Sequence, residues 1–553
     1  MFSNNMFERF SIPKLVEIIG ESKLETISGA LRILNLDNHS GEEVYTKGFL
    51  SNFAAKTIGY DYLNSSTGFD TVFETLTLEE ARQVCGATGQ ELNKQDCHDK
   101  AKFLFKVRSK RKSLFNSMGI QFDDSEYSSS RKDISSFEFL SKAAVPYKPL
   151  KDYQFEVYFQ ALDILKNDYS RFILQMPTGS GKTRTAMEVI TSFLNTYPDS
   201  SVVWLAHSTE LCDQASECFL EVWPHVSTRD INFQRYFGTH TLSKDSDLEI
   251  DFLCTSFQSA YGLITKNPEF LNSRLHRKRL IVVDEAHKVI APTYKSVTQA
   301  LQLHTTQIMG LTATPGRSYK EFNSEDENSE LAKFFFERII TFNPRDKGAI
   351  EYLREKGVLA HAKSEVLTID GDINLSSKEL QQVSQLFEIP ASVLDKIGKN
   401  SIRNAEILAK INQLVTNQTA RNIIFFGTSV EHSVLICSLL KFLDIKAEHV
   451  DGNTPKTTRE KIIKKFKNQE INVLCNYEVL STGFDAPKTD CVFLARPTSS
   501  VVLYSQMIGR GLRGPAIGGT ESCLIVNVRD NFTNLPSIDM MYKVFEDYWK
   551  QLP

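Results

Sequence analysis

A stretch reading PTGSGKT occupies residues 177–183 and directly follows the apolar run RFILQM. Gly179 and Gly181 let backbone N–H groups approach phosphate oxygens, and a helix beginning here would direct its positive end at them. Lys182 supplies a point charge for β- and γ-phosphates, and Thr183 supplies a hydroxyl for Mg²⁺. Taken alone, GKT after a strand could also be an ordinary helix-opening turn.

A pair of acidic residues, Asp284 and Glu285, directly follows the four apolar residues LIVV in the stretch LIVVDEAHK (280–288). In parallel α/β sheets the phosphates of a ligand lie at the carboxyl edge of the strands. Asp284 therefore suits an outer-shell Mg²⁺ role, and Glu285 suits polarising an attacking water. The alternative is two solvated carboxylates at a strand end, and the phosphate loop upstream disfavours it.

The order of five motifs resembles that of superfamily 2 helicases, over residues 145 to 535. The motifs are PTGSGKT, DEAH (284–287), LTATPGR (311–317), STGFDAP (481–487) and QMIGRGLR (506–513). Met176 stands where the general phosphate loop has its first glycine, a departure that is usual in the helicase form. APTYKSV, TATPGR and AIEYLREKGVLA resemble the group that contains XPB and the ResIII-like motor subunits of restriction enzymes.

The resemblance implies that the cofactors are ATP and Mg²⁺ and assigns a role to each matching position. The residues expected to bind ATP are Gln154, Thr178, Gly179, Ser180, Gly181, Lys182, Thr183, Gly483 and Asp485. Those expected to hold Mg²⁺ are Thr183 and Asp284. Those expected to act in hydrolysis are Lys182, Asp284, Glu285, Gln506, Arg510 and Arg513. Gln154 would read adenine, although in isolation it could be any glutamine on a helix.

Coupling of hydrolysis to movement is the role implied for Thr312 and Thr314, and His287 is expected to contact Gln506 across the gap between two domains. A polar turn before Pro315 and an ordinary buried histidine are the alternatives. Arginine residues 510 and 513 are three apart, so on a helix they would share a face and reach across that gap. The guanidinium fork stabilises charge developing on a transferred phosphoryl group. Both arginines are therefore arginine-finger candidates.

Nucleic acid is the implied partner, DNA before RNA, held mainly through its phosphates. The expected contacts are His207, Thr255, Gln258, Thr428 and Thr482, each in a short polar turn after a strand. Any one of them could be only a turn. The net charge of −4 gives no global sign of such a partner, so contact must come from local surface. RNA helicase activity is an alternative.

The elements that must position these residues are short apolar runs separated by helical stretches, typical of strands buried on both faces of a parallel sheet. The predicted fold is α/β, with two tandem RecA-like parallel-sheet domains preceded by a mainly α-helical N-terminal domain. The expected divisions are a helical domain (1–122), a linker (123–144), RecA-like domain 1 (145–316), an inter-lobe connection (317–402), RecA-like domain 2 (403–535) and a C-terminal helix (536–553).

The helical N-terminal region carries no phosphate loop of its own. Ser11 is expected to cap one helix, and Thr77 and Glu80 to form a capping box on another. KAKFLFKVRSKRK (100–112) is basic and suits phosphate contact, but a solvated basic face is the commoner outcome. A second hypothesis is therefore a sensor or scaffold that binds a partner protein through this region, in bacterial defence against phage.

Composition bounds the class of protein: 41% hydrophobic and 24% charged residues are typical of a soluble globular chain. No apolar stretch approaches the roughly 18 residues that a membrane span requires, and the N-terminus does not resemble a secretion signal. We therefore expect a cytoplasmic protein without a membrane partner. Nine scattered cysteines without a CxxC pair predict buried thiols.

Overall fold

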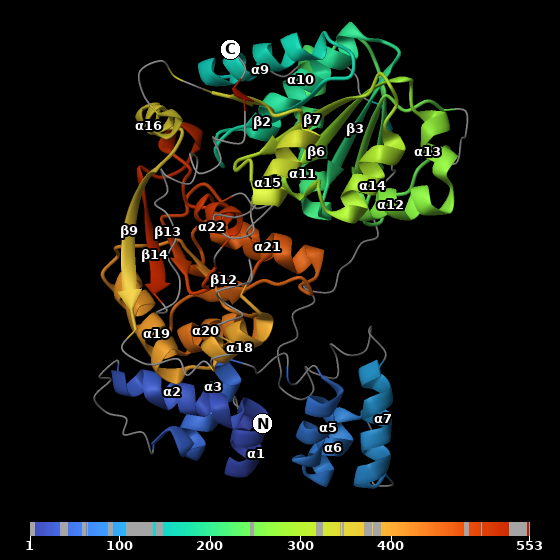
Figure 1. Ribbon diagram of the computed structural model, residues 1–553. Helices are drawn as coiled ribbons and strands as arrows, with labels where there is room; N and C mark the ends of the chain where they lie inside the picture. Colours follow the sequence, from blue (N-terminus) through green and yellow to red (C-terminus); the bar gives the residue numbers. More distant parts are fainter. Residues whose placement is uncertain are drawn as a thin grey trace.

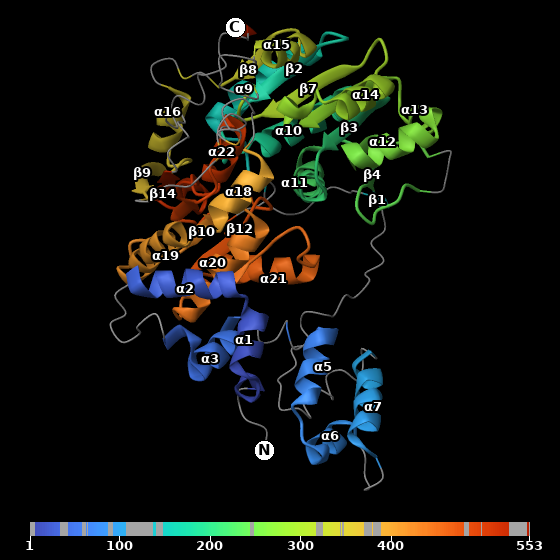
Figure 2. The same ribbon diagram turned by 60° about the horizontal axis from the view of Figure 1, so that its bottom comes forward.

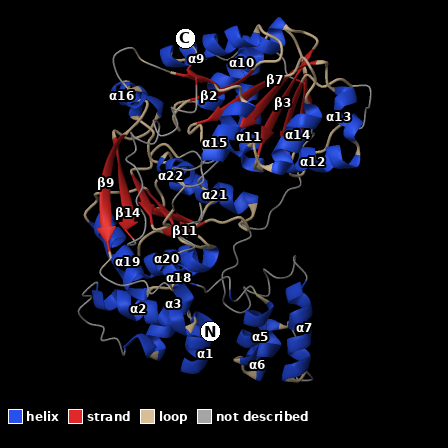
Figure 3. Cartoon of the chain, in the orientation of Figure 1, coloured by secondary structure: helices blue, strands red, loops and turns tan. Residues whose placement is uncertain are grey.

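The fold is given by a computed structural model (Figure 1). It describes residues 6–33, 43–57, 62, 65–86, 92–106, 137–139, 147–243, 248–316, 325–342, 344, 348–369, 376, 379, 389–480, 486–498, 500–529 and 550–551. Two sheets lie in separate lobes, with helices packed around each (Figure 3). The predicted fold class, two parallel-sheet RecA-like domains after a helical N-terminal region, is confirmed.

The first lobe is built on a nine-stranded sheet in the order β1-β4-β5-β3-β6-β7-β2-β8-β15, parallel except where β1 meets β4. The strands are β1 (Phe137–Phe139), β2 (Arg171–Gln175), β3 (Ser200–Ala206), β4 (Asn232–Tyr236), β5 (Phe252–Ser256), β6 (Lys278–Asp284), β7 (Gln307–Thr312), β8 (Arg338–Thr341) and β15 (Lys550–Gln551). The helices are α9 (Asp152–Leu165), α10 (Lys182–Thr196), α11 (Thr209–Val226), α12 (Phe257–Lys266), α13 (Pro268–Arg274), α14 (Pro292–Leu301) and α15 (Glu325–Phe334).

The apolar runs of this lobe follow from burial on both faces. In β2, Phe172 and Leu174 belong to the core beneath α9, α10 and α11, while Ile173 belongs to the core beneath α12, α14 and α15. Because successive strand residues point to opposite faces, a strand covered on both sides needs an apolar residue at every position. The continuous apolar run Phe172–Leu174 is the sequence signature of that burial.

The second lobe has a six-stranded sheet, β11-β12-β10-β13-β14-β9, in which all pairs are parallel. Its strands are β9 (His361–Thr368), β10 (Ile423–Phe426), β11 (Ala447–His449), β12 (Val473–Asn476), β13 (Cys491–Leu494) and β14 (Ser522–Arg529). Its helices are α18 (Ala391–Gly398), α19 (Ser401–Thr416), α20 (Val430–Phe442), α21 (Lys456–Lys467) and α22 (Val501–Ile508). Helix α16 (Ala349–Glu355) lies on the path from the first lobe to the second (Figure 1).

The first three N-terminal helices pack against the second lobe through α2 and α3, although the first lobe follows them in sequence, and the next three pack on one another. The helices are α1 (Ile12–Ile19), α2 (Glu21–Ile33), α3 (Lys47–Thr57), α5 (Ser66–Glu74), α6 (Leu78–Val84) and α7 (Lys94–Lys106). Helix α2 lies beside α19, and α3 beside α20 (Figures 1 and 2). The rings of Phe49 and Phe53 contact Phe442 at centroid distances of 5.1 and 5.3 Å. Helices α1 to α3 thus complete the core of the second lobe.

Local signals at the N-terminus are confirmed where the structure describes them. The Ser11 side chain accepts a hydrogen bond from the backbone N–H of Lys14 at the start of α1. Thr77 and Glu80 form the predicted capping box of α6. The carboxylate of Glu80 also accepts hydrogen bonds from both terminal nitrogens of the Arg9 guanidinium, at 2.8 and 3.0 Å, which joins α6 to the short 3-10 helix Met6–Arg9.

Three expected boundaries differ from the structure. The connection expected over 317–402 is divided between the lobes, because β8 pairs with β2 in the first sheet and β9 pairs with β14 in the second. The expected linker, 123–144, contains β1. In the expected C-terminal helix, the described residues 550–551 form β15, which pairs with β8. The strands β1, β8 and β15, of 3, 4 and 2 residues, are too short for sequence patterns to separate them from loops.

The nine cysteines are free thiols, and all except Cys218 are buried. No helix within the described ranges combines the length and apolar character needed to cross a membrane.

Candidate nucleotide site

Three motifs of the first lobe meet at one edge of its sheet because three of its strands are paired in register. Gln175, at the end of β2, pairs with Thr312 of β7, and Asp284 of β6 pairs with Leu311. The backbone N–H of Met176 donates to the carbonyl of Thr312 at 3.2 Å. Parallel strands therefore bring PTGSGKT, DEAH and TATP to their common carboxyl edge.

The phosphate loop needs glycine at two positions. Gly179 and Gly181 have φ values of 85° and 88°, in the left-handed region that disfavours residues with a side chain. A methyl group added at Gly181 would also lie 2.5 Å from Nε2 of Gln154. Helix α10 begins at Lys182, directly after the loop, as predicted. The strand, loop and helix thus leave room for phosphate against backbone N–H groups.

The acidic pair is buried, and its two carboxyls have different environments. Burial raises the pKa of Asp284 to about 6, partly offset by Lys182, and its side chain is 5% exposed. Burial alone would raise the pKa of Glu285, but the positive charge of Lys182, followed by His287, lowers it to about 2. Glu285 has a φ of 52°, an uncommon conformation for a residue other than glycine. Glu285 is therefore ionised at neutral pH and suited to orienting a water molecule.

A chain of polar contacts connects the acidic pair to the TATP turn. Nδ1 of His287 lies 3.4 Å from Oε2 of Glu285 and 3.4 Å from the hydroxyl of Thr312. Thr312 donates to the carbonyl of Thr314 at 2.8 Å and accepts from its backbone N–H at 3.2 Å. Nε2 of Gln506 has no hydrogen-bond partner in the described chain, and the expected contact between His287 and Gln506 stays a prediction.

Gln154 lies behind the phosphate loop. Its Oε1 accepts the backbone N–H of Lys151 at 2.9 Å, and its Nε2 donates to the carbonyl of Gly181 at 3.3 Å. The neighbouring Tyr153 donates its hydroxyl to the carbonyl of Ser180 at 2.8 Å, a contact that sequence reasoning missed. Helix α9 therefore supports the loop from behind, and the adenine-reading role of Gln154 stays a prediction.

The predicted arginine pair lies after a helix rather than on it. Helix α22 ends at Ile508, and Gly509 caps it, so the expected shared helix face was wrong. A methyl group at Gly509 would lie 2.4 Å from Cγ2 of Thr178 in the other lobe. The close approach of the lobes thus requires glycine where the helix would have continued, and the arginines are presented by the turn that follows.

Both arginines face the first lobe. A methyl group at Gly179 would lie 3.7 Å from Cγ of Arg513, and the charge of Glu285 acts on Arg510. Burial lowers the pKa of each arginine to about 10, which leaves both charged at neutral pH. Leu359, on the path between the lobes, forms a β-bridge with Arg513. Both arginines therefore lie where the second lobe meets the phosphate loop and the acidic pair, and their role as arginine fingers stays a prediction.

Oxygen donors suited to Mg²⁺ are present beside the loop. Thr183, the second residue of α10, is partly exposed, and the charge of Lys182 acts on the buried Asp284. Hydroxyl and carboxylate oxygens are the ligands that Mg²⁺ takes when it also binds substrate phosphates. The residues thus fit the expected cation. Gly483 and Asp485, the other expected nucleotide contacts, lie outside the described residues.

The expected nucleic-acid contacts differ in their accessibility. Thr255 and Thr428 are buried; the first donates its hydroxyl to Tyr236 O at 2.7 Å, and the second lies 3.1 Å from Nδ1 of His432. Gln258 is exposed in the first turn of α12, and His207 is partly buried after β3. Thr482 lies outside the described residues. All five contacts stay predictions. Because the side chains of Thr255 and Thr428 are buried, a bound nucleic-acid strand would contact backbone atoms at these two positions.

An ion pair between the lobes was also missed. Nη1 of Arg459, on α21, lies 2.9 Å from Oε1 of Glu210, on α11. Arg459 Nη2 also donates to the carbonyl of Asp451 at 3.0 Å. The two partners are 249 positions apart in sequence, so no local pattern could have paired them.

Comparison with known families divides the chain in the same way as the site. Residues 147–317 match the ResIII family, the type III restriction enzyme res subunit. Residues 406–514 match the helicase conserved C-terminal domain. The first match includes the phosphate loop and the acidic pair, and the second includes Gln506, Arg510 and Arg513. Each match thus contributes one half of the candidate site.

Individual relatives are similar over the two lobes. IRC3 of Saccharomyces cerevisiae, named as an ATP-dependent helicase, is 26% identical over 66% of this chain and 49% of its own. Its Schizosaccharomyces pombe counterpart, named as mitochondrial, is 27% identical over 69% of this chain and 57% of its own. The chain spans about half the length of these curated relatives. The solved type ISP restriction-modification enzyme LlaBIII, bound to DNA, is 19% identical, with a TM-score of 0.49 over 72% of this chain and 29% of its own.

Proposed function

We propose that this chain, which joins a ResIII domain to a helicase C-terminal domain in the superfamily 2 helicase fold, hydrolyses ATP to move along or remodel DNA. One observation carries the proposal: two lobes supply complementary halves of a single site. Gly179 lies against Arg513, and the charge of Arg510 is coupled to Glu285. Because each half is incomplete alone, any motion that separates the lobes would stop hydrolysis.

The reaction transfers the γ-phosphoryl group of ATP to water. Lys182 and the loop N–H groups hold the β- and γ-phosphates, and the ionised Glu285 orients the attacking water. Arg510 and Arg513 stabilise the charge that develops on the transferred group. Mg²⁺ held by Thr183 and Asp284 would neutralise phosphate charge. Thr312 and Thr314, hydrogen-bonded to each other and linked through His287 to Glu285, carry the change in the site to the rest of the first lobe.

DNA is the proposed substrate, and a restriction-type or anti-phage system is the proposed setting. The ResIII match supports both, since restriction enzymes act on DNA. The expected contact segments follow strands of both lobes and would meet phosphates, which carry no base sequence information. We therefore expect binding that is independent of sequence.

The test is the ATPase rate of the full chain against duplex, single-stranded and forked DNA and against RNA of equal length. We expect DNA to raise kcat at least about tenfold and RNA to raise it less. Equal or greater stimulation by RNA would favour RNA remodelling. Absence of hydrolysis with every nucleic acid would contradict the proposal. A displacement assay on the forked DNA then separates unwinding from movement alone.

A sensor or scaffold role is the second candidate, favoured by the packing of the N-terminal helices. Because α2 and α3 share a core with α19 and α20, a partner bound to these helices would move with the second lobe as the site closes. Capture experiments with the full chain, with and without a non-hydrolysable ATP analogue, test this role. A partner retained only with the analogue would support it; normal unwinding by the isolated chain, with no retained partner, would count against it.

A further inference from the structure

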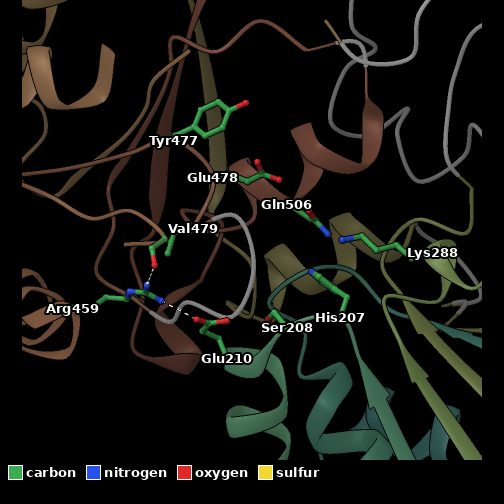
Figure 4. A pocket seen from close by; sticks show the side chains of 10 residues that line it. His207, Ser208, Glu210, Lys288, Arg459, Tyr477, Glu478, Val479 and Gln506 are labelled. Carbon is green, nitrogen blue, oxygen red and sulfur yellow. Dashed lines mark hydrogen bonds and ion pairs between the residues drawn. The ribbon is translucent and has the colours of Figure 1, made fainter. Parts of the chain in front are cut away.

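A pocket of about 450 Å³ lies between the lobes, beside the candidate nucleotide site (Figure 4). Residues from both lobes line it: His207, Ser208, Glu210, Lys288, Gly452, Arg459, Tyr477, Glu478, Val479 and Gln506. Helix α11, whose N-cap is Ser208, begins at its wall and directs the positive end of its dipole there. The pocket is large enough for a small anion together with several water molecules, each of about 30 Å³.

The acidic side chains of this pocket are already matched by arginines. Glu210 pairs with Arg459 at 2.9 Å, and Oε2 of Glu478 lies 3.6 Å from Nη1 of Arg496. The Arg496 guanidinium also lies 4.2 Å from the centre of the Tyr477 ring. Each acidic lining side chain of the pocket thus lies beside an arginine, while the charge of Lys288 acts on Asp284 and Glu285.

Hydrogen-bond donors are left over on the pocket wall. Gln506 is 8% exposed, and its Nε2 has no hydrogen-bond partner within the described chain. The same holds for Nδ1 of His207. In Figure 4 the amide of Gln506, the ammonium group of Lys288 and the ring of His207 point toward one another across the pocket. A buried donor without a partner costs free energy, so a ligand with several acceptor oxygens would be stabilised here.

The pocket adjoins the place where the γ-phosphate would be cleaved. His207 and Lys288 both influence the pKa of Glu285, the proposed water-orienting residue, so both lie near it. Gln506 accepts the Nε–H of the arginine-finger candidate Arg510 through its backbone carbonyl, at 3.2 Å. An anion leaving the γ-phosphate position in this direction would therefore pass from Glu285 and Arg510 directly to Lys288 and Gln506.

We propose that this inter-lobe pocket binds the inorganic phosphate produced by hydrolysis, held by Lys288, Gln506 and His207 before it leaves the protein. The inference rests on the proposed ATPase function. Cleavage breaks the bond between the γ-phosphorus and the bridging oxygen of ADP and forms a bond to the water oxygen, so the product is a free phosphate. Its tetrahedral oxygens match three convergent donors from different elements.

The pocket is built to release this anion as well as to bind it. Burial, and then the charge of Lys288, lowers the pKa of His207 to about 4, so the ring is neutral at pH 7. His207 thus offers an N–H group without adding a second positive charge beside Lys288. One cation and two neutral donors hold phosphate more weakly than a cluster of arginines would. Opening of the lobes would separate Gln506 from the other two donors and free the ion.

The experiment compares Lys288→Met with the matched control Lys295→Met, in which an exposed lysine on α14, paired with Glu330, is changed in the same way. Equilibrium dialysis of radiolabelled inorganic phosphate against the full chain with saturating ADP measures the affinity for phosphate in the absence of turnover. Inhibition of steady-state ATPase activity by added phosphate measures phosphate binding during turnover. We expect Lys288→Met to weaken phosphate affinity and phosphate inhibition at least about tenfold. Lys288→Arg should restore most of the loss, and Lys295→Met should behave as the unchanged chain.

Equal phosphate affinity and equal inhibition in Lys288→Met and the unchanged chain would overturn the proposal. The proposal would also be overturned if Lys288→Met left inhibition by phosphate unchanged but weakened DNA binding. The salt dependence of DNA binding would then fall by about one phosphate contact, and the pocket would hold a backbone phosphate of the DNA. If the unchanged chain hydrolyses no ATP, the proposed function fails separately, because dialysis still decides whether phosphate binds at Lys288.

Discussion

The two lobes have similar parallel sheets but carry different chemistry at their strand edges. The first lobe presents a glycine-rich loop, a lysine and two carboxylates, which together can hold a triphosphate and a metal ion. The second presents guanidinium groups on a turn after α22. A nucleotide could therefore bind to the first lobe alone, whereas hydrolysis requires the second. Moving the lobes apart should therefore abolish ATP hydrolysis in this chain while nucleotide binding is retained.

The lobes also differ in how their sheets are covered. Both faces of the first sheet are covered by helices that lie between its own strands in sequence, α9 to α15. One face of the second sheet shares a continuous core with helices from the N-terminus of the chain, including Phe53 of α3. The second lobe therefore depends on a distant segment for its stability, and that segment must follow its movement.

The largest expected effect separates binding from hydrolysis within the first lobe. Glu285→Gln removes the charge that orients water, so we expect ATPase activity to fall by more than about 10³-fold while ATP binding is retained. Lys182→Ala should lose both, because the phosphates lose their cation. Nucleotide titration and single-turnover hydrolysis measure the two quantities, with the exposed Glu269→Gln as control. Retained turnover in Glu285→Gln would show that another residue positions the water.

Substitution of Arg510 in the second lobe should have a similarly large effect, confined to kcat. Arg510→Ala should lower kcat by about 10³-fold, the usual contribution of an arginine finger, with nucleotide affinity within a few-fold. Arg510→Lys should restore little, since a single ammonium cannot replace the planar fork. Arg421→Ala changes an exposed arginine of the same lobe and serves as the control. Loss of nucleotide binding in Arg510→Ala would contradict the proposal that the first lobe binds the nucleotide and the second is needed only for hydrolysis.

A moderate effect on stability tests whether the N-terminal helices belong to the second lobe. Phe53→Ala leaves a cavity beside Phe442 and should lower the free energy of unfolding of the second lobe by about 3 kcal/mol. Calorimetry of the full chain should show the transition of one lobe shifted and the other unchanged. Phe159→Ala, at an exposed ring on α9, should change stability by less than about 0.5 kcal/mol. A shift of both transitions would mean that the lobes unfold as one unit.

The smallest expected effect concerns the ion pair that joins the lobes. Glu210→Gln and Arg459→Ala, alone and combined, should show a coupling of less than about 1 kcal/mol, because Glu210 is partly exposed. The apparent KM for ATP should rise two- to fivefold at low salt and less at high salt. The double-mutant cycle measures the coupling directly. Independent effects of the two changes would show that the pair does not contribute to closure.

Sequence reasoning succeeded where the signal is local. The run RFILQM followed by PTGSGKT predicts strand, loop and helix, and the structure has β2, the loop and α10 in that order. It failed where packing decides the local conformation. Arg510 and Arg513 follow the end of α22, where Gly509 lies against Thr178 in the other lobe and Gly511 lies against Cys523. Neither neighbour is close in sequence.

The sequence by itself determined the sheets, the phosphate loop and the acidic pair, because strand periodicity, glycine conformations and charge at a strand end depend on residues a few positions apart. Only the tertiary structure decided that β8 and β9 belong to different lobes, that Arg459 meets Glu210, and that the N-terminal helices pack on α19 and α20. These contacts join segments hundreds of residues apart. Their partners are chosen by the shape and charge of folded surfaces, which no short window of sequence contains.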